Sequence, residues 1–375
     1  MSGSTAVTVT SQPTSGQTTT VYVSGATAIP NAAYSYVATY WVNGAATVLP
    51  LPSGATGSSA TGIAVSNGDV YVVGNAVEAG GDTAAYWVND TLETLPTPSG
   101  WTDSLANAIT VSGSDVYIAG NAYDSSTGTE TAVYWVNGTP EVLPLPSGTT
   151  ISEGNAIAVS GSDVYVAGGA WDSITANSTI AAYWVNGTLE TLPPPSGAIE
   201  SQANAIAVSG GNVYVTGYGQ NTSTLSQSDG LTTIAAYWVN GTLETLPLPN
   251  GAIESQANAI AVSGGDVYVA GDYANSVAVV GTAVYWVNGA ATVLPTPSGP
   301  AGSSGSVNTG IVASGIAVSG GDVYAVGYIY AQTETGALGG DVYTAAYWVN
   351  GTLETLSLPS GSTGALATGI AVSTQ

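Results

Sequence analysis

The sequence has no lysine, arginine, histidine or cysteine among its 375 residues, and its 24 acidic residues give a formal net charge of −24. Nucleic acid and anionic membrane surfaces are therefore excluded as ordinary partners, because both are bound chiefly by Lys and Arg. The absence of thiols and imidazoles excludes disulfides, cysteine nucleophiles, histidine bases and Cys/His zinc sites. Calcium is the kind of ion that the remaining oxygen ligands suit. No motif supports a calcium site, so the sequence predicts no cofactor.

The missing basic groups also bear on the environment of the protein. Asp and Glu titrate near pH ~4, so below about pH 3 the chain approaches neutrality, whereas an ordinary protein accumulates repelling positive charge and acid-denatures. This composition suits an acidic exterior. Two alternatives stay open: selection for economy or protease resistance in an abundant secreted product, and compositional accident.

Long apolar runs are absent as well. No run reaches the roughly 18 residues of a membrane-spanning helix, and the start MSGSTAVTVT lacks the charged and apolar regions of a signal peptide. We expect an extracellular or cell-surface protein, which requires that a signal was removed or that Met1 was added.

The chain does contain a repeat of four short phrases. In one full unit these phrases are residues 156–160, 163–166, 183–186 and 188–193, rich in Val, Ile, Tyr, Trp and Thr, which is typical of strands. The tryptophans of the third phrase are 46 to 62 residues apart, and repeats of about 40–50 residues with four strands indicate propeller blades. We predict an all-β, seven-bladed β-propeller of four-stranded blades; a β-solenoid is the alternative.

The first phrase occurs eight times and the other three occur seven times each, so one terminal strand is surplus. Residues 368–373 match residues 61–66 at every position, which predicts that the carboxy-terminal copy closes the ring. The expected closing residues are Ile370, Ala371 and Val372. The expected surplus strand is Ala6, Val7, Thr8, Val9 and Thr10. We therefore divide the chain into an amino-terminal strand and linker, 1–16, and a propeller, 17–375.

The repeats, which run Ser-Gly-x-Asp-Val-Tyr-Val-Ala-Gly and then Tyr-Trp-x-Asn-Gly, resemble a family of secreted microbial β-propeller repeat proteins. The resemblance covers roughly residues 17–375 and implies the propeller fold and export. It carries over no catalytic residue. The chain departs from the family in charge, because Val42, Val88 and Val136 stand where such repeats often have Lys.

A surplus strand is an aggregation hazard unless it is paired, and pairing with a second subunit is β-strand addition. Head-to-tail donation does not close and produces a filament, in the manner of the strand-donation threads of archaeal and bacterial surfaces. We therefore predict a homopolymer held by the surplus strand. The alternative is a monomer in which this segment is unpaired or adds a strand to its own chain.

A carbohydrate-binding face is compatible with either form. Ten recurrent acidic residues and Asp90 aside, the other 13 acidic residues are all expected in the connections on one face, together with aromatic residues that break the repeat. Among these 13 are Glu78, Asp103, Asp124, Glu153, Asp172, Asp229 and Asp341. Aromatic planes cover the apolar face of a sugar, and carboxylates and amides meet its hydroxyls. The candidate sugar-binding residues are Trp101, Trp171 and Tyr123.

Two further patterns have plainer interpretations. Recurrent aspartates at the first hairpin, among them Asp69 and Asp163, are interpreted as turn residues and not as a cation ring. No carboxylate pair stands out for glycoside hydrolysis, so the sequence predicts a protein that is not an enzyme.

Seven sequons are candidate glycosylation sites in an exported chain. They are Asn89, Asn137, Asn177, Asn186, Asn221, Asn240 and Asn350.

Overall fold

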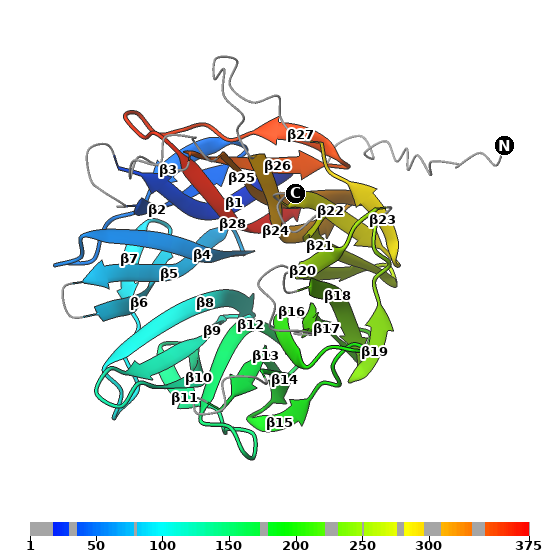
Figure 1. Ribbon diagram of the computed structural model, residues 1–375. Coiled ribbons are helices and arrows are strands. Elements are labelled where there is room, and N and C mark those ends of the chain that lie inside the picture. Colours follow the sequence, from blue (N-terminus) through cyan, green and yellow to red (C-terminus); the bar gives the residue numbers. More distant parts are fainter. Residues whose placement is uncertain are drawn as a thin grey trace.

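The computed structural model describes residues 18–29, 36–78, 81–172, 179–221, 232–249, 251–275, 281–295, 309–331 and 342–374. Within these ranges every regular element is a β-strand, and the strands form seven four-stranded antiparallel sheets. The sheets are arranged as blades around a common centre (Figure 1). The predicted seven-bladed β-propeller is thus confirmed. None of the described segments is a helix that could cross a membrane.

Each blade runs from a long inner strand to a short outer one. The inner strands of blades 1 to 7 are β28 (Ala365–Thr374), β4 (Gly57–Ser66), β8 (Asp103–Ser112), β12 (Ile151–Ser160), β16 (Glu200–Ser209), β20 (Glu254–Ser263) and β24 (Thr309–Ser319). The second strands are β1 (Thr19–Ala28), β5 (Asp69–Glu78), β9 (Asp115–Asp124), β13 (Asp163–Trp171), β17 (Asn212–Asn221), β21 (Asp266–Ala274) and β25 (Asp322–Ala331).

The third and fourth strands follow in the same blade order. The third strands are β2 (Tyr36–Val42), β6 (Gly81–Val88), β10 (Thr129–Val136), β14 (Ile180–Val185), β18 (Thr232–Val239), β22 (Thr282–Val287) and β26 (Val342–Val349). The outer strands are β3 (Ala45–Val48), β7 (Thr91–Thr94), β11 (Thr139–Val142), β15 (Thr188–Thr191), β19 (Thr242–Thr245), β23 (Ala290–Val293) and β27 (Thr352–Thr355).

The carboxy-terminal strand closes the ring. In blade 1, β28 pairs antiparallel with β1, with Ile370, Ala371 and Val372 opposite Val23, Tyr22 and Val21. The carboxy-terminal strand therefore fills the inner position of blade 1, as expected, while the other three strands of that blade come from the amino-terminal part of the chain. The amino-terminal copy, residues 6–10, lies outside the described residues.

Asn-Gly hairpins join the third strands to the outer strands. Asn186 and Gly187 have φ of 49° and 77°, the left-handed pair that a type I′ turn requires and that Asn and Gly adopt most easily. The Asn186 carboxamide also accepts from Val164 N and donates to Asp163 Oδ1 at the first hairpin of its own blade. The contact recurs at Asn89, Asn137, Asn288 and Asn350 with their own aspartates. This recurrence supports the interpretation of the aspartates as turn residues.

One tryptophan per blade fixes the packing between blades. Each lies in a third strand, is fully buried, and donates its indole N–H to a backbone carbonyl at the end of the preceding blade's outer strand, at 2.7–3.1 Å. A buried indole N–H needs such a partner. The tryptophans are Trp41, Trp87, Trp135, Trp184, Trp238, Trp286 and Trp348. Because Trp41 of blade 1 reaches Ser357 of blade 7, the set of contacts closes on itself.

A second closed ring of hydrogen bonds lies on the inner strands. Every inner strand has a β-bulge, and the bulged residue donates a side-chain hydrogen bond to a carbonyl of the next inner strand, at 2.8–3.0 Å. The seven donors are Thr61, Asn107, Asn155, Asn204, Asn258, Ser314 and Thr368. A β-bulge leaves one residue unpaired in the ladder, and here that residue links the blades.

The bulge also explains a recurrent glycine in the second strands. A Cβ atom on Gly217 would overlap the carbonyl oxygen of Gln202, just before the bulge of β16, and equivalent overlaps occur in the other six blades. Close backbone approach is one of the few situations that demand glycine within a strand. The glycines are Gly25, Gly74, Gly120, Gly168, Gly217, Gly271 and Gly327.

We predict that Asn107→Ala lowers the free energy of unfolding by about 1–3 kcal/mol, because it leaves the carbonyl of Gly154 without its inter-blade donor. Urea unfolding followed by tryptophan fluorescence measures the change. Asn107→Thr is the matched control, since threonine performs the same task in blades 1 and 2, and it should lose less. Equal losses in the two variants would show that the hydrogen bond contributes nothing.

Candidate ligand-binding site

A pocket of about 390 Å³ lies on one side of the ring, against blades 5, 6 and 7. Its volume falls within the range of small-molecule sites, ~300–1,000 Å³. Two carboxyl groups, Glu254 and Asp272, and three tyrosines are among its lining residues. The other lining residues are Gln220, Thr233, Ser255, Gln256, Ala274 and Gly281. The lining thus combines aromatic rings, amides, hydroxyls and carboxyl groups.

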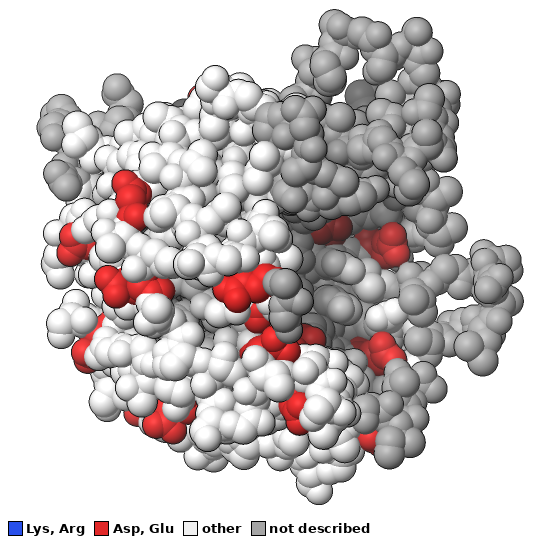
Figure 2. Space-filling view, turned by 90° about the vertical axis from the view of Figure 1, so that its left-hand side faces the viewer, with Lys and Arg blue, Asp and Glu red and all other residues white. Residues whose placement is uncertain are grey.

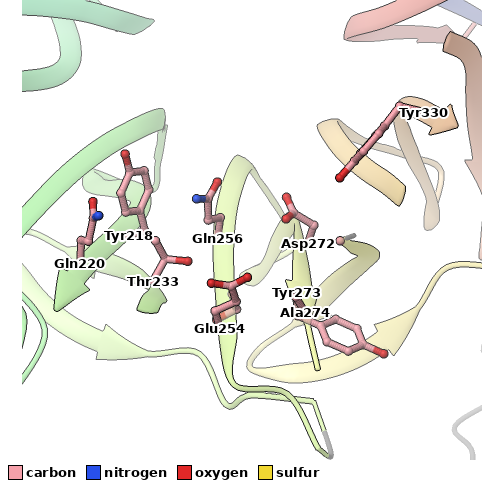
Figure 3. Close-up of a pocket in the computed structure, with 11 residues that line it drawn as sticks. Tyr218, Gln220, Thr233, Glu254, Gln256, Asp272, Tyr273, Ala274 and Tyr330 are labelled. Carbon is pink, nitrogen blue, oxygen red and sulfur yellow. The ribbon is translucent and has the colours of Figure 1, made fainter. Parts of the chain in front are cut away.

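Two tyrosines flank the polar centre of the pocket. Figure 3 shows Tyr218 and Tyr330 on opposite sides, with Gln256, Glu254 and Asp272 between them. The polar groups come from adjacent strands, because Gln256 of β20 is paired with Asp272 of β21. Strand pairing therefore fixes the amide and the carboxyl group side by side.

Asp272 is the most deeply placed of these carboxyl groups. Burial raises its pKa to about 6, and the charge of Glu254 adds to the rise, although Asn258 donates a hydrogen bond to Asp272 Oδ1 at 3.0 Å. Burial also raises the pKa of Glu254. Near pH 6 Asp272 is therefore protonated in part, so its carboxyl group can donate a hydrogen bond as well as accept one.

A second pocket, of about 430 Å³, lies between blades 4 and 5. It is lined by Glu153, Asn155, Trp171, Thr179, Gln202, Asn204 and Tyr218. Tyr218 lines the first pocket as well. The two pockets are therefore neighbours that share one aromatic residue.

Glu153, which lines the second pocket, forms a pair with a further carboxyl group, Glu130. Burial, together with the charge of Glu153, raises the pKa of Glu130 to about 7, although Asn121 hydrogen-bonds to it. Burial also raises the pKa of Glu153, while Gln202 opposes that rise. Burial and the charges of Glu153 and Glu200 likewise raise the pKa of the Tyr218 hydroxyl, which keeps it protonated. Acidic side chains also appear on the face in Figure 2, where no basic residue accompanies them.

The three aromatic residues expected to bind sugar are not brought together. Trp171 lines the second pocket. Trp101 is half-buried and packs against the core between blades 2 and 3, and Tyr123 is exposed on β9 of blade 3. Neither of the two lines either pocket.

The expected position of several acidic residues needs correction. Glu78, Asp103, Asp124 and Glu153 were assigned by the repeat to connections, but all four lie within strands. The reason is that the inner and second strands extend for nine to eleven residues, well beyond the repeated phrases. Asp229 and Asp341 lie outside the described residues.

The sequence interpretation missed Glu254, Gln256, Asp272 and Tyr330. A comparison of the blades position by position would have found two of them, Gln256 and Asp272. The inner-strand residue two positions before the bulged one is Glu153, Gln202 and Gln256 in blades 4 to 6. In blades 1, 3 and 7 it is Leu366, Leu105 and Val312, and in blade 2 it is the small Ser59. In blades 4 to 6 its second-strand partner is Gly169, Tyr218 and Asp272.

Among the described residues no group of three or more acidic side chains could hold a metal ion. The sequon asparagines Asn89, Asn137, Asn186, Asn240 and Asn350 all donate their amide N–H to a neighbouring hairpin side chain. A glycan at these positions would compete with that contact. Asn221 lies at the end of β17, and Asn177 lies outside the described residues.

No protein-family model matches the sequence, and no curated protein matches it significantly. Solved structures do match its fold. The acylaminoacyl peptidase of Pyrococcus horikoshii has a TM-score of 0.50 at 12% identity, over 94% of this chain and 52% of the peptidase. A polysaccharide lyase of family PL25, an ulvan lyase, has a TM-score of 0.45 at 10% identity, over 81% of each chain.

A GH32 β-fructofuranosidase of Bombyx mori has a TM-score of 0.37 at 11% identity, over 84% of this chain and 90% of that chain. At these identities the likenesses show the fold alone, and this chain spans only about half the length of the peptidase. Different functions are commonly built on one fold. The comparisons therefore assign no ligand and no reaction to this chain.

The expectation that the chain is not an enzyme is contradicted, because the same fold occurs in an enzyme, the acylaminoacyl peptidase of Pyrococcus horikoshii, and gives no ground for excluding catalysis. The composition removes Lys, Arg, His and Cys from any reaction. Carboxyl groups and tyrosine hydroxyls remain as groups that could take part in a reaction. The pKa values of Glu130 and Asp272 are raised to about 7 and about 6, so both side chains titrate near neutral pH.

We predict that the protein is more stable at pH 4 than at pH 7.5. The pKa of Glu130 is about 7 and that of Asp272 about 6 in the fold, against about 4 in an unfolded chain. A raised carboxyl pKa means that the folded state binds the proton more tightly, so this stability is complete below about pH 4 and is lost as pH rises through 6 to 7.

Thermal melting by circular dichroism across pH 2 to 8 measures the effect. The double variant Glu130→Gln, Asp272→Asn separates these two groups from the general relief of repulsion among acidic residues, and its melting temperature should change less between pH 4 and 7.5. A wild-type melting temperature that falls steadily from pH 7.5 to pH 4 would contradict the prediction.

Proposed function

We propose that this chain binds uncharged carbohydrate through the pocket against blades 5, 6 and 7. The observation that carries the proposal is the composition of that pocket: tyrosines on two sides, with an amide and two carboxyl groups between them (Figure 3). Aromatic rings pack against the C–H face of a sugar, and amides and carboxyl groups bind its hydroxyls. Gln256 and Asp272, adjacent through strand pairing, supply both donors and acceptors.

The charge of the chain supports an uncharged ligand. With no Lys, Arg or His and a formal charge of −24, the pocket has no cation to hold a carboxylate, sulfate or phosphate group. An acidic sugar would also meet Glu254 and Asp272 at close range. Neutral hydroxyl groups avoid both penalties.

We also propose that the protein works outside the cell or at its surface, in an acidic environment. The composition motivates this proposal, and the raised pKa values of Glu130 and Asp272 support it, since they favour the fold in mild acid.

We predict that a glycan array will retain the wild-type protein on neutral polysaccharides and not on uronic-acid polymers at pH 5 to 6. Gln256→Ala should weaken binding about tenfold, because it removes hydrogen bonds worth roughly 1–1.5 kcal/mol. Tyr123→Ala is the matched control, since Tyr123 is exposed on blade 3 and lines neither pocket. Failure of the wild type to bind any neutral glycan would remove the proposal.

A second proposal concerns assembly. We infer that residues 1–16 donate their strand, Ala6 to Thr10, to a neighbouring subunit and so build a filament. The supporting observation is that β28 fills the inner position of blade 1, so ring closure does not need the amino-terminal copy. Subunits without basic groups form no intermolecular salt bridges between side chains, which leaves backbone pairing and apolar burial to hold a polymer.

We predict that the full-length protein forms filaments in the electron microscope at pH 2 to 5, where repulsion among acidic residues is lost, and that high salt does not dissolve them. Deletion of residues 1–16 should give monomers that keep the circular dichroism spectrum of the propeller. Sedimentation that finds both forms monomeric from pH 2 to 7 would refute strand donation.

A further inference from the structure

The two neighbouring pockets repeat the same set of chemical groups. The pocket against blades 5 to 7 has tyrosines, Gln256 and the carboxyl groups of Glu254 and Asp272. The pocket between blades 4 and 5 has Trp171, Gln202 and the carboxyl group of Glu153. Each pocket therefore offers an aromatic ring, an amide and a carboxyl group.

The pockets share Tyr218, which lines both. Tyr218 of β17 is paired with Gln202 of β16, a residue of the second pocket, and Gln220 two positions further along β17 lines the first pocket. Alternate residues of a strand share one face, so Tyr218 and Gln220 face the same side. A ligand that spans both pockets along this strand would contact Tyr218.

The register of the blades places both sets of groups at equivalent depth. Glu153, Gln202 and Gln256 occupy the same position relative to the bulge in three successive inner strands. Between the first two, Gln202 Nε2 donates to Glu153 Oε2 at a long 3.5 Å. Gly169, opposite Glu153, has no side chain, and a Cβ there would overlap the Gln202 amide. Glu153 of blade 4 and Gln202 of blade 5 thus meet across the boundary between the two blades.

We propose that the two pockets are adjoining subsites for one linear, uncharged oligosaccharide of at least two sugar units, with Tyr218 at their junction and Trp171 as the aromatic platform of the second. This inference rests on the proposed carbohydrate-binding function and adds to it the chain length and direction of the ligand. An extended chain uses both sets of groups at once, whereas a monosaccharide uses one.

Calorimetric titration at pH 5.5 tests the inference with named probes. These are glucose, xylose, mannose and galactose, each with its β-1,4-linked disaccharide and tetrasaccharide, and the α-1,4-linked maltose and maltotetraose. For the series that binds, we expect the tetrasaccharide to bind at least tenfold more tightly than the monosaccharide. Trp171→Ala should remove that gain and leave the affinity for the monosaccharide unchanged, because the first pocket is intact.

Trp101→Ala is the matched control, since Trp101 is the other tryptophan outside the repeat and lines neither pocket; it should leave all affinities unchanged. Gln202→Ala is a second variant in the same subsite, for use if Trp171→Ala does not keep the wild-type circular dichroism spectrum. Affinity that is independent of chain length, or an equal loss for monosaccharide and tetrasaccharide in the subsite variant, would overturn the two-subsite inference while the single pocket stands. No binding of any probe would overturn both.

Discussion

The β-bulge in each inner strand is the constraint on which the rest of the structure depends. It sends one side chain, such as Asn155, to a carbonyl of the next blade, and it pushes the preceding carbonyl against the second strand, where only glycine fits, as at Gly168. These two consequences account for a closed ring of seven hydrogen bonds and for a glycine in every repeat. The residue two positions before the bulged one differs from blade to blade. In blades 4 to 6 it is Glu153, Gln202 and Gln256, which line the pockets.

A chain without basic side chains has to join its blades without ion pairs between side chains. It does so with one buried indole N–H per blade and one bulge donor per blade, both of which reach backbone carbonyls of a neighbouring blade. Among the described residues no buried side-chain polar atom lacks a hydrogen-bond partner. Neutral hydrogen bonds of this kind do not depend on ionisation, so protonation of the acidic residues leaves them intact while it lowers repulsion. The inter-blade contacts and the acidic composition are therefore consistent with each other.

The architecture could be predicted from the sequence because its determinants are local and repeated. Strand composition, Asn-Gly turns and the spacing of the tryptophans identify four strands per blade, and the match of residues 368–373 to the consensus identifies the closing strand. The pockets could not be predicted in the same way. Glu254 and Asp272 are far in sequence from Tyr218 and Tyr330, which line the same pocket, and their placement together follows from strand register across blades that no local pattern encodes. Treating these acidic residues as loop residues also concealed them, because the strands extend beyond the repeated phrases.

The positions where the blades differ carry more functional information than the positions where they agree. Identical residues at seven equivalent places, such as the tryptophans, satisfy a packing requirement that every blade shares, so they give a ligand no preferred side of the ring. The change from Leu105 and Leu366 to Glu153, Gln202 and Gln256 replaces apolar side chains with large polar ones on three adjacent blades, while blade 2 has the small polar Ser59 at this position. Such replacements add no apolar burial. Burying carboxyl groups also costs free energy, as the raised pKa values of Asp272 and Glu153 show. This cost falls on the side of the ring where the two pockets lie, and it is an observation that motivates the proposed binding there.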